Sequence, residues 1–108
     1  MVAWARSAIA AISVLSVTAV SAPAMAQGRA RLTLFSQPSL RGARVTLMRS
    51  TPDLRTVGFN DRAASLRATG RWRVCEHIRY RGRCQTVRGN RSSLRLAGLI
   101  SSARFEGF

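Results

Sequence analysis

LFSQPSLRGARVTL, residues 34–47, is followed 40 residues later by a related stretch, VCEHIRYRGRCQTV, residues 74–87. An Arg-Gly pair stands at the same place in both stretches. The residue two positions before the glycine is large and apolar or aromatic, and a threonine stands four positions after it. Similarity at a fixed offset indicates that one structural unit occurs twice in the chain.

The correspondence extends beyond these stretches. Gly58 matches Gly98 at the same offset, and after a shift of three residues AASLR, residues 63–67, matches ISSAR, residues 100–104. The pattern indicates an internal duplication with a small deletion in the second copy.

Both copies alternate apolar and polar residues in the way that is typical of β-strands. The apolar positions of this pattern include Leu32, Leu34, Val45, Leu47, Val74 and Val87. No stretch of residues 27–108 sustains an apolar stripe of helical period. We therefore expect eight short strands in two sheets, packed as a sandwich so that each sheet buries one side.

Glycine and serine recur at matched places in the two copies. Gly42 and Gly82 are expected to adopt positive φ, which allows a hairpin to fold back over its own sheet. Ser65 and Ser102 are suited to hydrogen-bond such a hairpin from a neighbouring strand.

These residues resemble the βγ-crystallin family of Greek-key domains. Each repeat of that family carries an aromatic residue, a second aromatic residue two places before a glycine, and a later serine. The residues in these places are Phe35, Leu40, Gly42 and Ser65 in the first copy and Cys75, Tyr80, Gly82 and Ser102 in the second. Leucine therefore replaces the second aromatic residue in one copy, and cysteine replaces the first in the other.

The resemblance covers residues 32–108 and implies an all-β fold of two Greek-key motifs that form a βγ-crystallin-like sandwich. We expect one domain at 27–108, with Greek keys at about 32–70 and about 72–108. The resemblance is closest to short, exported bacterial members with paired cysteines.

Residues 1–26 have the layout of a secretory signal peptide. Arg6 is their only charge, residues 8–20 are apolar except for serine and threonine, and Ala24 and Ala26 are the small residues that a signal peptidase reads. The apolar run is shorter than the roughly 20 residues that span a bilayer. We expect cleavage before Gln27 and a protein that is periplasmic or secreted, not membrane-spanning.

The segment CEHIRYRGRC, residues 75–84, contains both cysteines of the chain and its one histidine. Its cysteine spacing differs from that of CxxC metal and redox motifs, and one histidine cannot complete a tetrahedral zinc site. In an exported protein Cys75 and Cys84 are expected to form a disulfide between adjoining strands. Closing so short a loop stabilises a fold by about 2.5 to 3 kcal/mol in the entropic model.

The resemblance also raises the question of calcium. Calcium-binding members of the family carry two Asn or Asp residues, two free positions and two hydroxyl residues in each Greek key, and their loops share ligands. The first copy keeps Asn60 and Asp61 but has Ala64 at a hydroxyl position, whereas the second keeps Ser101 and has lost both amide or acidic positions. The resemblance thus implies at most one weak site, formed by Asn60 or Asp61 with Ser101.

A second interpretation makes Asn60 and Asp61 a turn whose side chains bond the nearby backbone. Arg62 and Arg67 stand close by, and one carboxylate is little charge with which to hold a divalent cation against water. We favour the turn over the calcium site and expect no other cofactor.

The chain is strongly basic, and all 18 of its basic residues are arginine. Without Arg6, the chain has 17 arginines and four Asp or Glu residues, which gives a net charge of +13. Such a surface attracts polyanions, although the absence of lysine fits a GC-rich genome equally well. Arg79, Arg81 and Arg83 form the candidate polyanion or partner loop. An ordinary solvated face is favoured over a dedicated nucleic-acid site, and an anionic envelope surface is the more natural partner.

The sequence does not indicate an enzyme. His77 has no patterned acid partner or nucleophile, and phosphate-binding loops and paired catalytic carboxylates are absent. We expect a structural or binding module of the bacterial envelope or exterior. The alternative is inhibition of an extracellular protease through the disulfide-tethered loop at 79–83, because the family resembles certain secreted metalloprotease inhibitors.

Overall fold

Five β-strands and two short 3-10 helices make up the described part of the chain. The computed structural model describes residues 29–108, so the predicted signal peptide and its cleavage site lie outside the described residues. The elements are β1 (Arg31–Gln37), β2 (Arg41–Leu47), η1 (Leu54–Val57), β3 (Ser65–His77), η2 (Ile78–Tyr80), β4 (Arg81–Arg91) and β5 (Ser102–Phe105). The strand pairs are antiparallel, and the predicted all-β class is confirmed.

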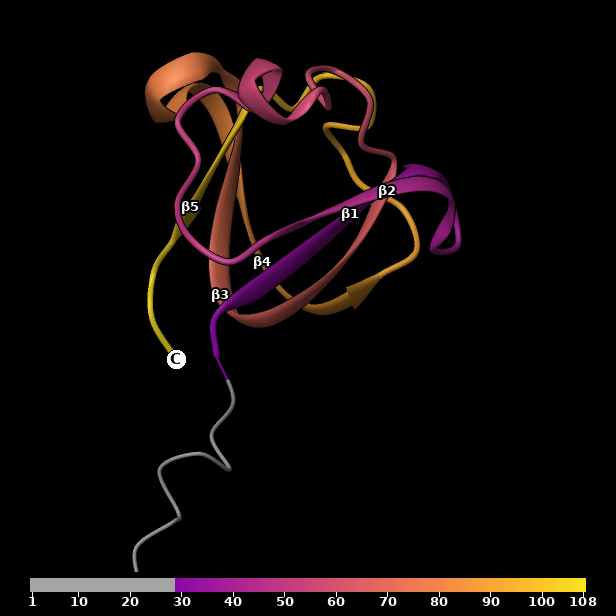
Figure 1. The fold of residues 1–108 in the computed structure, drawn as a ribbon, viewed down its shortest axis with the longest axis horizontal. Helices are drawn as coiled ribbons and strands as arrows, with labels where there is room; N and C mark the ends of the chain where they lie inside the picture. The colour runs from indigo at the N-terminus through magenta and orange to yellow at the C-terminus, as the bar shows by residue number, and fades with distance from the viewer. Residues whose placement is uncertain (1–28) are drawn as a thin grey trace, which may run out of the picture.

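The strands form two layers that share the two longest of them (Figure 1). β2 pairs with β1, and β1 pairs with the first part of β3. β5 pairs with the last part of β3. β4 pairs with both parts of β3. The paired residues run from Leu66 and Arg91 at one end to His77 and Arg81 at the other.

Five strands stand where eight short ones were expected, because β3 and β4 each run through both layers. Residues 65–69 of β3 pair with β1, and residues 72–75 pair with β5. An isolated bridge from Thr51 to Ala103 also brings a piece of the first half beside β5. Each layer therefore contains strands from both halves of the chain.

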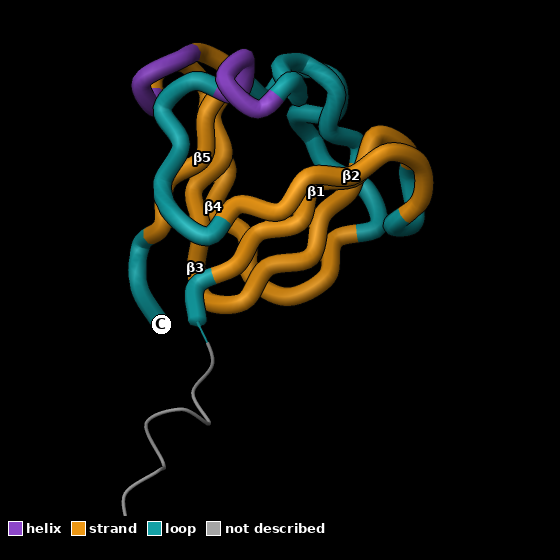
Figure 2. Tube along the Cα trace, in the orientation of Figure 1, coloured by secondary structure: helices purple, strands orange, loops and turns teal. Residues whose placement is uncertain are grey.

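The core lies between the layers, where the strands curve around a common interior (Figure 2). Alternation along β1 points Leu32 and Leu34 inward, and Trp72 is completely buried at the centre. The indole Nε1 of Trp72 donates to the carbonyl oxygen of Thr69 at 3.1 Å, so its polar edge is satisfied. The larger core residues are Leu32, Leu34, Leu47, Leu54, Phe59, Leu66, Trp72, Val74, Val87, Leu94, Leu96 and Ile100.

The two 3-10 helices are short turns that the sequence pattern does not indicate. Asp53 caps η1, because its Oδ1 accepts a hydrogen bond from the backbone N–H of Arg55 at 3.0 Å. The Arg55 guanidinium also donates to Oδ2 at 2.8 Å. These bonds from Arg55 lower the pKa of Asp53 from its usual value. Within residues 29–108, no helix is long and apolar enough to cross a membrane.

Candidate functional site

Ser65 holds the β1–β2 hairpin against the start of β3. Its Oγ donates to the carbonyl oxygen of Gln37 at 2.6 Å and accepts from the backbone N–H of Leu40 at 2.9 Å. Leu40 is left-handed, with φ of 59°, so the hairpin bends sharply before β2 begins. The serine is fully buried, so both backbone groups depend on this hydroxyl.

Ser102 does the same for the β3–β4 hairpin. Its Oγ donates to the carbonyl oxygen of His77 at 2.6 Å and accepts from the N–H of Tyr80 at 3.0 Å. Ser102 is also fully buried. The two hairpins are therefore held in the same way, each by a strand from later in its own half.

Glycine is required where each hairpin folds over. Gly42 and Gly82 have φ of +87° and +80°. A Cβ at Gly42 would overlap the hydroxyl of Ser36, and one at Gly82 would lie 2.5 Å from Cδ2 of His77 and 2.6 Å from Cγ of Glu76. Both the backbone conformation and the crowding therefore disfavour a side chain at these positions.

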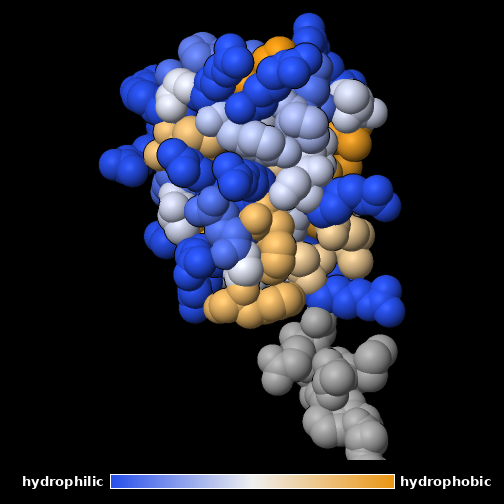
Figure 3. Space-filling view, turned by 90° about the vertical axis from the view of Figure 1, so that its left-hand side faces the viewer, coloured by the Kyte–Doolittle hydropathy of each residue, from blue (hydrophilic) through white to orange (hydrophobic). Residues whose placement is uncertain are grey.

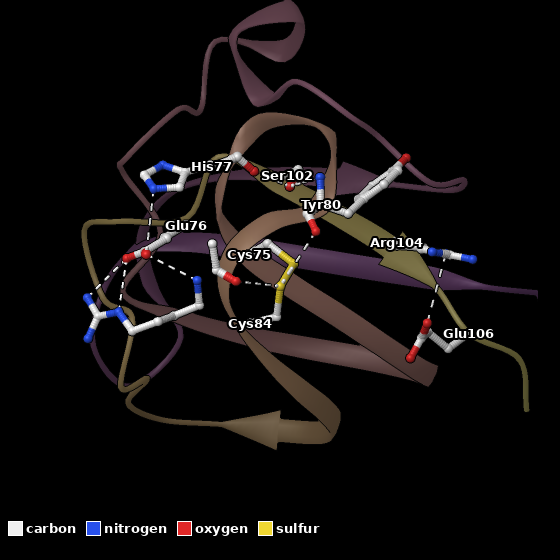
Figure 4. The surroundings of a disulfide bond; sticks show 10 residues. Cys75, Glu76, His77, Tyr80, Cys84, Ser102, Arg104 and Glu106 are labelled. Atoms are coloured by element: carbon white, nitrogen blue, oxygen red, sulfur yellow. Dashed lines mark hydrogen bonds and ion pairs between the residues drawn. A yellow bond between two sulfur atoms is a disulfide. The ribbon is translucent and has the colours of Figure 1, made fainter.

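The predicted disulfide between Cys75 and Cys84 is confirmed (Figure 4). The two residues face each other in the β3–β4 pair, with Cα atoms 4.1 Å apart. Cys75 is completely buried. The bond therefore ties the two strands together next to the folded hairpin.

Glu76 adds a polar clamp beside the disulfide. Its Oε1 accepts from the backbone N–H of Arg83 at 3.1 Å, and its Oε2 lies 3.0 Å from Nη2 of the same arginine. These contacts, the backbone bond first, lower the pKa of Glu76 from its usual value. Ser36 occupies the matched place in the other hairpin and accepts from the N–H of Ala43 at 2.9 Å. Sequence reasoning missed this pair of acceptors, although both positions are polar and 40 residues apart.

The three arginines of the candidate partner loop lie in different settings. Arg79 is in η2 with φ of 60°, and its N–H donates to the carbonyl oxygen of Pro52 at 2.8 Å. Arg81 is exposed at the start of β4. Arg83 pairs with Glu76, so its charge is partly neutralised. The three do not act as one cluster of free cations.

Asp61 and Ser101 meet where the two long loops lie side by side. The Ser101 hydroxyl donates to Oδ1 of Asp61 at 3.2 Å. Backbone bonds join the same loops, from the N–H of Asp61 to Ile100 and from the N–H of Gly98 to Ala63, each at 2.9 Å. The loops thus bring together two of the three residues named for calcium.

The hydrogen bonds correct one correspondence drawn from the sequence. Gly98 takes the same place in its loop as Asp61, because the N–H of each bonds the carbonyl two residues beyond the other. Both backbones are left-handed, with φ of +77° at Gly98 and 55° at Asp61. Gly98 does not take the place of Gly58. Ala97 and Gly98 therefore fill the places of Asn60 and Asp61, so these positions are present in the second loop but lack oxygen donors.

The donor set around Asp61 is of the kind that calcium binds but is sparse. Asn60 contributes a buried Oδ1 that has no hydrogen-bond partner among the described residues, and Ser101 contributes a hydroxyl. Arg62 is engaged elsewhere, since its Nη1 donates to the carbonyl oxygen of Gly58 at 3.1 Å. No group of three or more His, Cys, Asp or Glu side chains gathers within residues 29–108. The residues fit one site with a single carboxylate, well below the charge of strong calcium sites.

The paired hairpins with their buried serines are those expected from the resemblance to βγ-crystallins, and the comparison with family models agrees. Residues 31–102 match the model described as Beta/Gamma crystallin. The chain is a member of the βγ-crystallin family. Comparison with curated proteins finds no match by sequence.

Solved βγ-crystallin structures share this fold across distant organisms. A βγ-crystallin from Ciona intestinalis has a TM-score of 0.67 and 23% identity, covering 70% of this chain and 99% of that one. A βγ-crystallin from an archaeon has a TM-score of 0.66 and 26% identity, covering 73% and 100%. A βγ-crystallin domain from Flavobacterium johnsoniae has a TM-score of 0.63 and 21% identity, covering 70% and 93%. The described part of this βγ-crystallin chain therefore corresponds to nearly the whole of each relative.

Proposed function

We propose that this protein is a non-enzymatic, exported structural and binding module of the bacterial envelope or exterior. The observation that carries the proposal is the disulfide between Cys75 and Cys84, which uses both cysteines of the chain. Disulfides form and persist in oxidising compartments and are rare in the cytosol. The secretory layout of residues 1–26 points to the same compartment.

The proposed role requires a folded state that is stable outside the cell. A domain of this size has a small core and is marginal without further support. Here the support comes from the disulfide and from β3 and β4, which pass through both layers. Such a module keeps its surface in a fixed shape outside the cell, where it is available for binding.

Export is tested by expressing the full chain in a bacterium, separating the cell fractions and measuring the mass of the protein. We expect residues 27–108 outside the cytoplasm with Cys75 and Cys84 joined. An Ala26→Arg control should block processing at this place. Recovery of the uncleaved chain in the cytoplasm with free thiols would overturn the proposal.

We propose further that calcium acts on this module as a weak stabiliser. Asn60, Asp61 and Ser101 would hold the ion through an amide, a carboxylate and a hydroxyl oxygen. The hydrogen bond between Ser101 and Asp61 supports this assignment, because it places two of the donors at one point. The ion would link the two long loops and so favour the folded state.

Protease inhibition is the second candidate function. The hairpin is rigid, since Arg79 and Tyr80 are held through their backbone N–H groups by Pro52 and Ser102. A rigid loop loses little entropy on docking. However, both residues have left-handed backbones rather than an extended one that could add to a sheet edge. Stoichiometric slowing of a secreted protease, lost on reduction of the disulfide, would support inhibition over simple structural use.

A further inference from the structure

The outward side of the layer formed by β3, β4 and β5 carries two arginines directly opposite each other. The strand register pairs Arg73 with Arg104 of β5 on one side and with Thr86 of β4 on the other. Trp72 and Val74 are buried, so the residue between them points outward. Both arginines are exposed.

A second pair of arginines extends this side of the layer. Arg71 stands two residues before Arg73 in β3, and Arg88 stands two residues after Thr86 in β4. The arginine face is defined here as Arg71, Arg73, Arg88 and Arg104. Glu106 lies beside it, with its Oε2 3.9 Å from Nε of Arg104. Arg73 has no ion pair or side-chain hydrogen bond among the described residues, so the face carries excess positive charge.

Like charges directly opposite on neighbouring strands destabilise a sheet. Arg73 and Arg104 occupy such a pair of positions, at which Cβ atoms lie about 5 Å apart. An anion bound between the two guanidinium groups would remove this repulsion. Phosphate suits the place, because each guanidinium presents a planar fork that matches its oxygens.

An exposed aromatic residue borders the arginine face. Phe108 is 61% exposed, and Nη2 of Arg88 donates to its backbone oxygen at 3.3 Å. Its ring packs edge-on against Phe105 with centroids 5.2 Å apart, and Phe105 packs against Trp72 at 5.4 Å. Figure 3 shows this side of the molecule, where hydrophilic side chains cover most of the surface and a smaller apolar area lies near its lower end.

We propose that the arginine face docks the protein on a bilayer rich in anionic phospholipid. The guanidinium groups bind lipid phosphates, and Phe108 enters the boundary between headgroups and acyl chains. This inference rests on the proposed function, because the protein must reach an envelope surface to meet such a bilayer. A bilayer fits better than a nucleic-acid strand, because strands bind along grooves. Three hollows of the described chain are lined by residues outside the arginine face.

Vesicle binding by the purified, oxidised chain of residues 27–108 tests the proposal. This chain contains every described element and lacks the apolar residues 1–26, which would bind lipid themselves. The probes are vesicles of phosphatidylcholine alone and vesicles mixed with phosphatidylglycerol. The double variant Arg73→Gln with Arg104→Gln should bind the mixed vesicles about 30-fold more weakly. Phe108→Ala should weaken binding to the mixed vesicles about tenfold.

The matched control removes the same charge from the other layer. Arg31 and Arg44 are exposed on β1 and β2, and replacing both with Gln should weaken binding no more than about threefold. Equal losses in the two double variants would overturn the proposal, since only net charge would then matter. Equal binding to both vesicle types would overturn it as well. Binding of a single-stranded oligonucleotide is measured alongside. If the double variant Arg73→Gln with Arg104→Gln loses oligonucleotide binding but keeps vesicle binding, the proposal is overturned and the face is assigned to nucleic acid.

The vesicle experiment is independent of export. A purified protein that fails to bind vesicles removes the arginine face as a docking surface and leaves the proposed export standing. A protein that binds vesicles but is found unprocessed in the cytoplasm removes the proposed function and leaves the surface chemistry standing.

Discussion

Ser65 and Ser102 show how single residues determine this fold. Each is a small polar side chain in a fully buried position, and each bonds one carbonyl and one N–H of a hairpin. Replacing either hydroxyl removes the partner of two backbone groups at once. The cost of leaving such groups unpaired exceeds the net value of the hydrogen bonds themselves.

Ser102→Ala is therefore expected to lower the free energy of unfolding by about 2 kcal/mol. Urea denaturation followed by tryptophan fluorescence measures this loss. Ser93→Ala, at an exposed position, is the control and should change stability by no more than about 0.5 kcal/mol. Similar values for the two variants would show that the buried hydroxyl is dispensable.

Gly82 and Gly89 allow backbone strain to be separated from crowding. Both have positive φ, but a Cβ at Gly82 would meet His77 and Glu76, whereas one at Gly89 meets nothing within 4 Å. Gly89→Ala should cost about 1 kcal/mol from the backbone alone. Gly82→Ala should cost about 3 kcal/mol, because crowding adds to the strain. Thermal melting of both variants measures the difference, and equal losses would argue against a closely folded hairpin.

The calcium question is also decided at single residues. Millimolar calcium should stabilise the protein by about 1 kcal/mol, seen as a small rise in melting temperature. Asp61→Asn keeps a hydrogen-bonding side chain but removes the charge, so the rise should vanish, as it should in Ser101→Ala. Ser93→Ala, at an exposed position outside the calcium motif, is the control and should leave the rise in place. No shift in the unaltered protein would remove the site altogether.

Among the elements, the β3–β4 hairpin contains most of the specific interactions that stabilise the fold. The disulfide, the bonds of Glu76 to Arg83 and the bonds of Ser102 all lie within or against it. The double variant Cys75→Ala with Cys84→Ala should lose about 2.5 to 3 kcal/mol of stability. A reductant should lower the melting temperature of the unaltered protein and leave this variant unchanged. A reductant effect in the variant would show that some other group is responsible.

The same hairpin makes stability depend on pH. The bonds from Arg83 hold the pKa of Glu76 below its usual value of 4.5 in the folded protein, so the unfolded chain takes up a proton first as the pH falls. This contribution to stability is complete above the usual value and is lost as the pH falls through the folded-state pKa. Urea denaturation between about pH 6 and about pH 3 should show a smaller loss for Glu76→Gln than for the unaltered protein. Identical profiles would mean that the clamp is not formed in solution.

Strand pattern, the glycines and the cysteine pair were sufficient to predict the all-β class, the family and the disulfide. They were not sufficient to predict that β3 and β4 run through both layers, because alternation marks a strand but not its partners. The equivalence of Gly98 and Asp61 was missed for a similar reason. The offset of 40 residues matches Gly98 with Gly58, because both are glycines. The backbone hydrogen bonds between the loops instead match Gly98 with Asp61. The pair Arg73 and Arg104 is likewise a product of register between strands that are distant in sequence.

At the scale of the whole molecule, the two halves depend on each other. The end of β4 completes the layer of β1 and β2, and Thr51 joins the layer of β5. The core between the layers includes residues from both halves, among them Leu34, Leu66, Trp72 and Ile100. Neither half can bury its apolar side alone, so the protein should unfold in one step.

The most direct test of this interlocked fold is equilibrium unfolding followed by two probes at once. Fluorescence of Trp72 in the chain of residues 27–108 reports on the core between the layers, and far-ultraviolet circular dichroism reports on the strands of both halves. We predict one transition with the same midpoint for both probes. Two separate midpoints, or a stable folded fragment that ends before β3 is complete, would contradict the account.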